Sequence, residues 1–282
     1  MKFRLNRQYG ALNSGPIFDA VEQGIKKIGH TTTNSDPDIE IIWSVLWHGR
    51  MAGNQMIYER SRQTGKPVMI IEVGNLMRGK TWRISLDHIH GLGKFGNDTD
   101  LDQHRIKFLD VDLKKPKENR RKEILIACQH QRSLQWEGQP KLIQWLDRTV
   151  REIRNYTDRP IIVRPHPRSP LQGIPNGVKI ETPIKVQNTY DDFNLNYDYH
   201  GIVNHNSGVA VSAAIQGIPV ITDPTSLAYP VSDIIKHIGD PKLPDREEWF
   251  LKLCHTEWLV EEIRQGTPFL RLMPELEKFN FS

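Results

Sequence analysis

Four polar residues, Asn204-His205-Asn206-Ser207, stand between a short apolar run and a stretch of small residues. The apolar run and the β-branched run at 218–221 predict two buried strands, and the small residues from 208 to 216 predict a helix between them. Ser207 is placed to be the N-cap of that helix. Free N–H groups and the positive end of the helix dipole favour an anion at a helix N-terminus. The predicted anion-binding residues are His205, Asn206, Ser207, Gly208 and Ser212. The alternative is an ordinary strand–helix–strand unit, in which the serine and asparagine residues would only cap the helix.

A second polar cluster, Arg164-Pro-His-Pro-Arg168, follows the apolar run at 161–163. Two prolines restrict the backbone and remove two N–H donors. Arginine presents a planar fork of donors that suits phosphate, and histidine adds another donor. Arg164, His166 and Arg168 are therefore predicted to bind a phosphate or diphosphate, although such a cluster in isolation is also typical of a surface turn.

The stretches Arg164-Pro-His-Pro167, His205-Asn-Ser-Gly208 and Ala214-Ile-Gln-Gly-Ile-Pro-Val220 together resemble the nucleotide-sugar half of a GT-B glycosyltransferase. They are similar to bacterial capsule-polysaccharide transferases, sialyltransferases with a His-Pro motif and phage-encoded glycosyltransferases. The tail from His255 to Gly266 also resembles the end of the phage proteins. The resemblance covers about residues 120–267. It implies an α/β chain with two Rossmann-like αβα domains facing across a cleft.

Composition sets the broad class. With 282 residues, 38% of them hydrophobic, the chain can form one large domain or two modest ones. No apolar run is long enough to span a membrane, and the N-terminus lacks an apolar signal core, so we expect a cytoplasmic protein without a membrane partner. If phage-encoded, it would act in the host cytoplasm. Only two cysteines occur, and a net charge of +4 permits a polyanionic partner.

The first hundred residues alternate between strand and helix patterns. Strands are expected near 3–5, 38–46 and 68–71, and helices near 15–28 and 54–64. This alternation is typical of a parallel sheet, in which ligands bind beyond the carboxyl ends of the strands. Those ends carry His48, Arg50 and Glu72.

The stretch from Met77 to Lys94 is rich in basic, aromatic and glycine residues. Its alternation predicts a strand, which ends at Asp87. Either a plain hairpin or an acceptor site fits the pattern; loops preferentially hold functional groups, which favours the site. We predict Asp87 as the general base, with Glu72 close enough to share the role and His88 behind them. The predicted acceptor-binding residues are His48, Arg50, Arg78, Lys80, Trp82, Arg83 and His90.

Residues 96–122 change from acidic to basic and are expected to connect two domains. Beyond them a strand at 123–128 leads to Gln129 and Arg132, which we add to the donor site. A helix is expected over 141–156, and two more over 246–255 and 257–265. The predicted domains are 1–115 for the acceptor and 120–265 for the nucleotide sugar, followed by a tail at 266–282.

The favoured function is a metal-independent glycosyltransferase that uses a nucleotide sugar, most simply a UDP-sugar, as substrate and needs no other cofactor. No Cys/His cluster has metal-ligand spacing, and the Asp110-x-Asp112 pair falls in the linker. Mild basicity and the phage-like tail favour a 5-hydroxymethylated pyrimidine in double-stranded phage DNA as acceptor. The alternatives are a capsule or surface glycan as acceptor, a UDP-sugar epimerase, and a nucleotide-binding module without catalysis.

Overall fold

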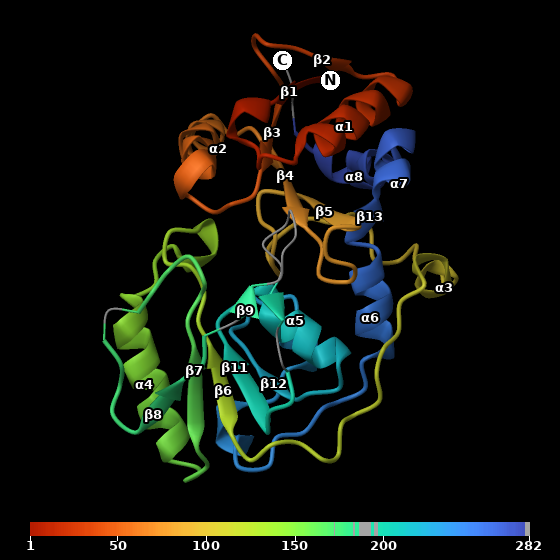
Figure 1. Ribbon diagram of the computed structural model, residues 1–282. Helices are drawn as coiled ribbons and strands as arrows, with labels where there is room; N and C mark the ends of the chain where they lie inside the picture. Colours follow the sequence, from red (N-terminus) through yellow and green to blue (C-terminus); the bar gives the residue numbers. More distant parts are fainter. Residues whose placement is uncertain (172, 183, 186–192, 195–196, 280–282) are drawn as a thin grey trace. The chain divides into compact units, whose positions relative to one another are not determined.

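The computed structural model describes residues 1–171, 173–182, 184–185, 193–194 and 197–279. These form two compact units, shown in Figure 1. The first unit contains residues 1–109 and 251–282, and the second contains residues 110–250.

The first unit is built on a six-stranded sheet in the order β13-β5-β4-β3-β1-β2. Strands β1 to β4 are parallel, whereas β5 and β13 run antiparallel to their neighbours. The central strands are almost wholly apolar because helices cover both faces of a parallel sheet. The strand bounds are β1 Lys2–Leu5, β2 Thr31–Thr32, β3 Ile39–Trp43, β4 Val68–Val73, β5 Thr81–Leu86 and β13 Glu257–Leu259.

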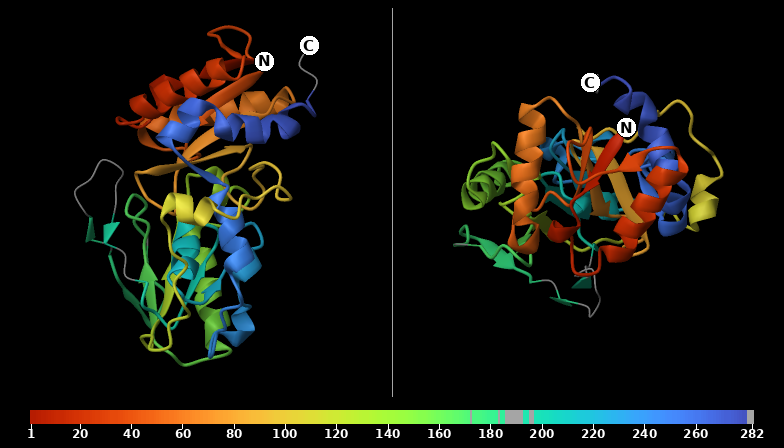
Figure 2. Two further views of the ribbon diagram at one scale, coloured as in Figure 1. Left: turned by 90° about the vertical axis from the view of Figure 1, so that its right-hand side faces the viewer. Right: turned by 90° about the horizontal axis from the view of Figure 1, so that it is seen from above.

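Helices α1 and α2 connect the parallel strands, as the sequence pattern predicts. Helix α1 packs beside the C-terminal helices α7 and α8, and the views in Figures 1 and 2 show these red and blue helices together. A Cβ atom at Gly24 of α1 would collide with the backbone of α7, so glycine permits this close approach. The helix bounds are α1 Gly15–Lys27, α2 Gly53–Gln63, α3 Arg105–Leu109, α7 Val260–Gln265 and α8 Thr267–Leu276.

The C-terminal segment corrects the predicted domain boundary. Residues 257–259 form β13 instead of the start of a helix, and they pair with β5 of the first sheet. Trp258 is buried there, and Arg105 lies over its ring and forms an ion pair with Glu262. The second unit therefore ends at residue 250, inside helix α6 (Glu247–Cys254), and not at residue 265.

The second unit contains a parallel five-stranded sheet in the order β12-β11-β6-β7-β8. Helix α4 covers one face and contributes Leu142, Trp145 and Leu146 to the core. Helix α5 connects β11 to β12, and a separate two-stranded ribbon pairs β9 with β10. The bounds are β6 Ile124–Ala127, α4 Leu142–Arg154, β7 Ile161–Arg164, β8 Val178–Ile180, β9 Ile184–Lys185, β10 Phe193–Asn194, β11 Gly201–Asn204, α5 Gly208–Ile215 and β12 Val220–Ile221.

The register of this sheet determines where its functional loops begin. Ala127, Arg164 and Asn204 are neighbours across β6, β7 and β11 and are the last residues of these strands. The loops that follow therefore all leave from the same edge, as expected for the carboxyl ends of parallel strands. In the described part of the chain, no helix has both the length and the apolar character needed to cross a bilayer.

Candidate functional site

A buried amide pair joins the loops after β6 and β11. The Gln129 side chain donates to Asn206 Oδ1 at 3.0 Å, and the Asn206 backbone N–H donates to Gln129 Oε1 at 3.2 Å. Both residues are about 95% buried, and Gln135 donates to the Asn206 carbonyl. Buried amides stabilise a structure only when they are paired in this way. We conclude that Gln129 and Asn206 hold the loops in place.

The same network extends to the loop after β12. Asn206 Nδ2 donates to the Thr225 hydroxyl at 2.9 Å, and this hydroxyl donates to Asp223 Oδ1 at 2.7 Å. The sequence analysis did not include Thr225 or Asp223. Their sequence pattern is a weak indication of a functional site, because an Asp-x-Thr pair after a strand is also typical of an ordinary turn. Three strand ends are thus joined by side-chain hydrogen bonds.

Two histidines join the loops after β6 and β7. The ring centroids of His130 and His166 lie 5.2 Å apart, edge to face. Each Nδ1 accepts the backbone N–H of the residue two positions later, Arg132 at 3.0 Å and Arg168 at 3.1 Å. In the neutral ring this places the proton on Nε2. The repeated His-x-Arg spacing was the signal that could have identified His130, which the sequence analysis missed.

These two His-x-Arg turns also expose cations. The side chains of Arg132 and Arg168 are exposed, whereas His130 is buried and His166 partly buried. Arg132 has no ion-pair partner among the residues that the structure describes. Guanidinium groups of this kind are suited to phosphate oxygens.

Helix α5 begins beside this network. Ser207 occupies the N-cap position as predicted, but its hydroxyl accepts from Asn204 Nδ2 at 3.0 Å and does not cap the first turn. Gly208, Val209 and Ser212 are the partly exposed positions of the helix. They lie on one side of it, since residues four apart share a helix face. The partly exposed side of α5 thus begins with Gly208 and Val209 in the first turn and continues with Ser212 in the second.

His205 is a buried member of this edge and not an exposed phosphate ligand. It is 5% exposed, its ring lies edge to face against Trp136, and its Nδ1 is 3.7 Å from Asp223 Oδ2. Burial lowers the pKa of His205, and the nearby Asp223 opposes this shift only in part. The ring is therefore neutral at pH 7 and orients the turn instead of contributing positive charge.

Arg164 has a different position from the one predicted. Its side chain is 4% exposed, and Nη2 donates to Glu181 Oε1 at 2.7 Å and to the Tyr199 hydroxyl at 3.1 Å. Tyr199 donates in turn to Glu181 at 2.6 Å. Burial and this hydrogen bond raise the pKa of Tyr199 to about 12. These contacts hold Nη2 of Arg164 inside the second unit instead of exposing it beyond the strand end.

In the first unit, Glu72 lies near the carboxyl end of β4. Its Oε2 accepts from Ser44 Oγ at 2.7 Å. Ser44 follows β3 with a φ of 63°, a left-handed conformation that is costly for a residue other than glycine. Strained residues that persist in this way are frequent at functional sites. Glu72, Arg83 and Glu257 are register partners on β4, β5 and β13, so their side chains share one face of the sheet.

Asp87 lies at the opposite edge, which corrects the prediction that it shares a role with Glu72. Because β5 runs antiparallel to β4, its end at Asp87 meets the start of β4 at Val68. The Asp87 carboxylate accepts the Val68 N–H at 3.0 Å and pairs with Arg62 at 2.8 Å. Four residues of extended strand, on the order of 13 Å, separate the backbones of Val68 and Glu72. Asp87 therefore anchors a strand end.

Two of the predicted acceptor residues are inaccessible. Trp82 is 3% exposed and lies in β5 between Val73 and Trp258. The Arg83 guanidinium donates to the carbonyl groups of Ile89 and Val73. Neither side chain is available to hold a nucleic acid strand.

The other predicted acceptor residues differ in exposure. His88 stacks on the buried His90 with ring centroids 4.9 Å apart, and Arg83 fixes their loop through Ile89. His48 and Arg50 after β3, and Arg78 and Lys80 after β4, are exposed. These four follow the carboxyl ends of neighbouring strands, the edge that also carries Glu72. Within the described ranges, no three His, Cys, Asp or Glu residues are grouped so as to hold a metal ion.

Comparisons with known proteins concern the fold. No family model matches the sequence, and no curated protein matches it. The structure is similar to that of Thermosulfurimonas dismutans KpsC, beta Kdo 2,7 transferase, with a TM-score of 0.51 and 13% identity over 95% of this chain and 98% of that chain. The beta Kdo 2,4 transferase of the same KpsC matches with a TM-score of 0.44 and 12% identity over 90% of this chain and 89% of that one.

A Methanocaldococcus jannaschii UDP-GlcNAc 2-epimerase matches with a TM-score of 0.33 and 12% identity, over 99% of this chain and 100% of that chain. Only the first of these similarities is close enough to support an argument, and at 13% identity it concerns the fold alone. The mixed first sheet, the parallel second sheet and this similarity confirm the predicted fold class, an α/β chain of the GT-B type with two Rossmann-like domains.

Proposed function

We propose that this protein is a glycosyltransferase that uses a nucleotide sugar as donor. The proposal rests chiefly on one observation. Side-chain contacts connect the loops after β6, β7, β11 and β12 at the carboxyl edge of the second sheet, beside the N-terminus of α5. The diphosphate would bind the first-turn N–H groups at Gly208, with Ser207 and Ser212 beside it. Arg132, Arg168 and the Nε2 proton of His166 would supply further donors.

The leaving group explains this concentration of donors. During transfer, the acceptor oxygen bonds to the anomeric carbon, and the bond from that carbon to the diphosphate oxygen breaks. The electron pair leaves with the diphosphate, so negative charge increases at its terminal oxygen. A helix dipole and two guanidinium groups stabilise this charge without a metal ion.

The proton of the acceptor hydroxyl must also be removed. We propose Glu72 as the general base, because its carboxylate lies near the carboxyl edge of the first sheet and is oriented by Ser44. His48, Arg50, Arg78 and Lys80 would bind the acceptor, since they are exposed at the same edge. His88 and His90 would support them from a fixed loop.

A carbohydrate is the acceptor that we favour. The solved structure that shares this fold with a TM-score of 0.51 is described as a Kdo transferase. The modified DNA base predicted from the sequence has less support, since Trp82 and Arg83, two of the side chains expected to hold the DNA, are buried. An epimerase would use similar donor contacts but would need no acceptor.

Product analysis tests the proposal. The protein would be incubated with UDP- and CMP-sugars, with either capsule-type oligosaccharides or 5-hydroxymethylated duplex DNA, and the products analysed by mass spectrometry. We expect one sugar mass to be added to an oligosaccharide. Addition to DNA would establish the alternative acceptor, an epimerised donor would identify an epimerase, and donor binding without any product would contradict catalysis.

A further inference from the structure

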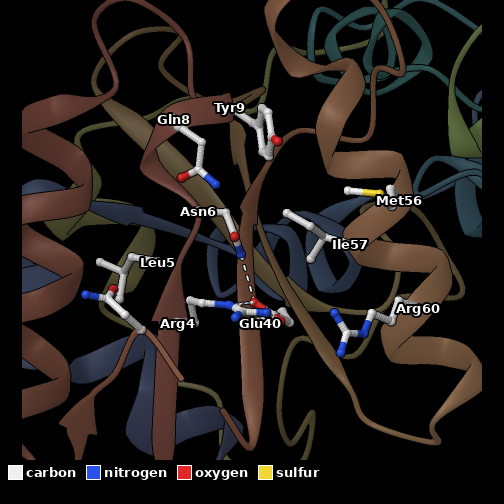
Figure 3. Close-up of a pocket in the computed structure, with 10 residues that line it drawn as sticks. Arg4, Leu5, Asn6, Gln8, Tyr9, Glu40, Met56, Ile57 and Arg60 are labelled. Carbon is white, nitrogen blue, oxygen red and sulfur yellow. Dashed lines mark hydrogen bonds and ion pairs between the residues drawn. The ribbon is translucent and has the colours of Figure 1, made fainter. Parts of the chain in front are cut away.

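A hollow of about 390 Å³ opens on the α2 face of the first sheet, beside β1 (Figure 3). Ligand pockets in proteins generally begin at about 300 Å³, so a single sugar unit fits. Residues from β1, the turn after it, β3 and α2 line it, together with Asn34 from the loop after β2, and all belong to the first unit. The proposed function does not use any of them.

The floor of the hollow is polar and rigid. Arg4 and Glu40 are register partners on β1 and β3 and form a bidentate ion pair, with Arg4 Nε donating to Glu40 Oε2 at 2.9 Å. Asn6 Nδ2 donates to the same Oε2 at 2.9 Å, the contact drawn as a dashed line in Figure 3. A carboxylate has about four lone-pair positions, and these bonds use three. The remaining position, on Oε1, can accept a hydroxyl hydrogen.

One wall is fixed by close packing. Tyr9 lies against the first turn of α2, where any side chain at Gly53 would collide with its ring. Asn54 on the same turn donates to the Tyr9 carbonyl at 3.3 Å and to the Trp43 carbonyl at 2.6 Å. Because glycine allows this contact, the Tyr9 ring packs against α2 at the side of the hollow, and Gln8 lines the hollow next to it.

A second wall comes from α2 and has an unbalanced charge. Met56 and Ile57 provide apolar surface, and Arg60 is exposed. No carboxylate lies within ion-pair distance of Arg60 among the described residues. Since Glu40 already neutralises Arg4, the lining carries one net positive charge. The hollow therefore combines an acceptor for a hydroxyl at its floor, apolar and aromatic walls, and one cation at its rim.

We propose that this hollow binds an acidic sugar unit, with the carboxylate at Arg60 and a hydroxyl at Glu40. A single cation suits a monoanion, whereas a phosphate dianion would lack a second partner. That this acidic sugar is part of the acceptor glycan rests on the proposed function. The binding of an acidic sugar in the hollow does not depend on it. An acceptor bound here would contain at least one acidic sugar besides the unit that receives the transferred one.

Methyl NMR tests binding without any activity. The chain has six methionines, so the Met56 methyl signal can be assigned by substitution, and Ile57 gives a second probe. Sodium glucuronate should shift both signals in a saturable manner, and glucose at equal concentration should bind at least about tenfold more weakly, since a charge-assisted hydrogen bond is lost. Inorganic phosphate should not compete with glucuronate.

Two variants sharpen the test. Arg60→Gln should weaken glucuronate binding about tenfold or more and leave glucose binding unchanged. Arg62→Gln is the matched control, because this exposed arginine of the same helix pairs with Asp87 outside the hollow, and it should bind glucuronate like the parent. Equal glucuronate affinity in Arg60→Gln, or no shift at Met56 and Ile57, would overturn the proposal. Sugar transfer that persists in that case would leave the proposed function intact.

Discussion

At the residue scale, two carboxylates with similar sequence settings have different roles in the structure. Glu72 and Asp87 both end apolar strands, and both were candidates for the general base. Strand direction separates them, because β5 reverses and takes Asp87 to the edge where β4 begins. Direction is hard to predict from the sequence, since the same alternation fits a parallel and an antiparallel strand.

This difference gives a paired prediction about catalysis. Glu72→Gln keeps the shape and the Ser44 contact but lacks a basic carboxylate, so we expect the transfer rate to fall about a hundred- to ten-thousandfold. Asp87→Asn should transfer sugar near the parent rate and unfold at a lower temperature, because it weakens the contacts to Val68 and Arg62. Rates measured with saturating donor test both variants. The reverse order of activities would restore Asp87 as the base.

At the element scale, the repeated strand–helix pattern allowed the positions of most helices to be predicted. Helices at 15–27, 53–63, 142–154 and 208–215 lie within two residues of the predicted positions, because apolar spacing and flanking glycines define them. The segment at 257–259 was predicted as a helix, since three residues carry too little pattern to reveal a strand. Its partner β5 lies far away in the sequence, and pairing with it decides the conformation.

The donor loops illustrate a second limit. The predicted ends of the strands indicated that residues 129, 166 and 205 lie at the same edge of the second sheet. They did not indicate which of these side chains are buried. Gln129 and His205 are buried beside Asn206 and Trp136 from other segments. Arg164 is buried too, and its Nη2 donates to Glu181 and Tyr199. His-x-Arg turns leave Arg132 and Arg168 exposed instead. The local sequence pattern predicts which loops lie at the carboxyl edge of the sheet. Hydrogen bonds between distant segments determine which side chains of these loops remain exposed to a ligand.

A prediction about β7 follows from this division. Arg164→Ala should lower the free energy of unfolding by about 1.5–3 kcal/mol, since Glu181 and Tyr199 lose a charged partner. His166→Ala should change stability little but weaken UDP or CMP binding about tenfold. Urea unfolding and calorimetry measure the two effects, with the exposed Arg151→Ala on α4 as control. If Arg164→Ala left stability unchanged and only weakened nucleotide binding, Arg164 would be a donor ligand.

At the scale of the whole molecule, local motifs and global architecture carry different information. The turns that were predicted to bind phosphate resemble those of GT-B glycosyltransferases, whereas no family model matches the chain. The fold similarity nevertheless spans 95% of the chain at 13% identity. Many apolar sequences can satisfy the same alternation of strands and helices, so the architecture persists where sequence similarity does not. Substrate identity must therefore be argued from the site.

The buried histidines make stability depend on pH throughout the molecule. Burial is the main cause that lowers the pKa of His200, His205 and His255 below the ordinary value of 6.5. The unfolded chain binds protons near that value while the folded chain does not, so acidification favours unfolding. Carboxylates with a lowered pKa, such as Glu181 and Asp233, act in the same direction only near pH 4 and below.

We therefore expect full stability above about pH 7 and a progressive fall in the free energy of unfolding as the pH drops below the ordinary histidine pKa of about 6.5. Urea unfolding at half-unit pH steps measures this loss. His205→Gln should make the pH dependence shallower, because one of the protons taken up on unfolding is removed. His104→Gln is the matched control, since its side chain is 91% exposed and should leave the slope unchanged. Stability that is constant or rises on acidification would contradict the neutral, buried state of these rings.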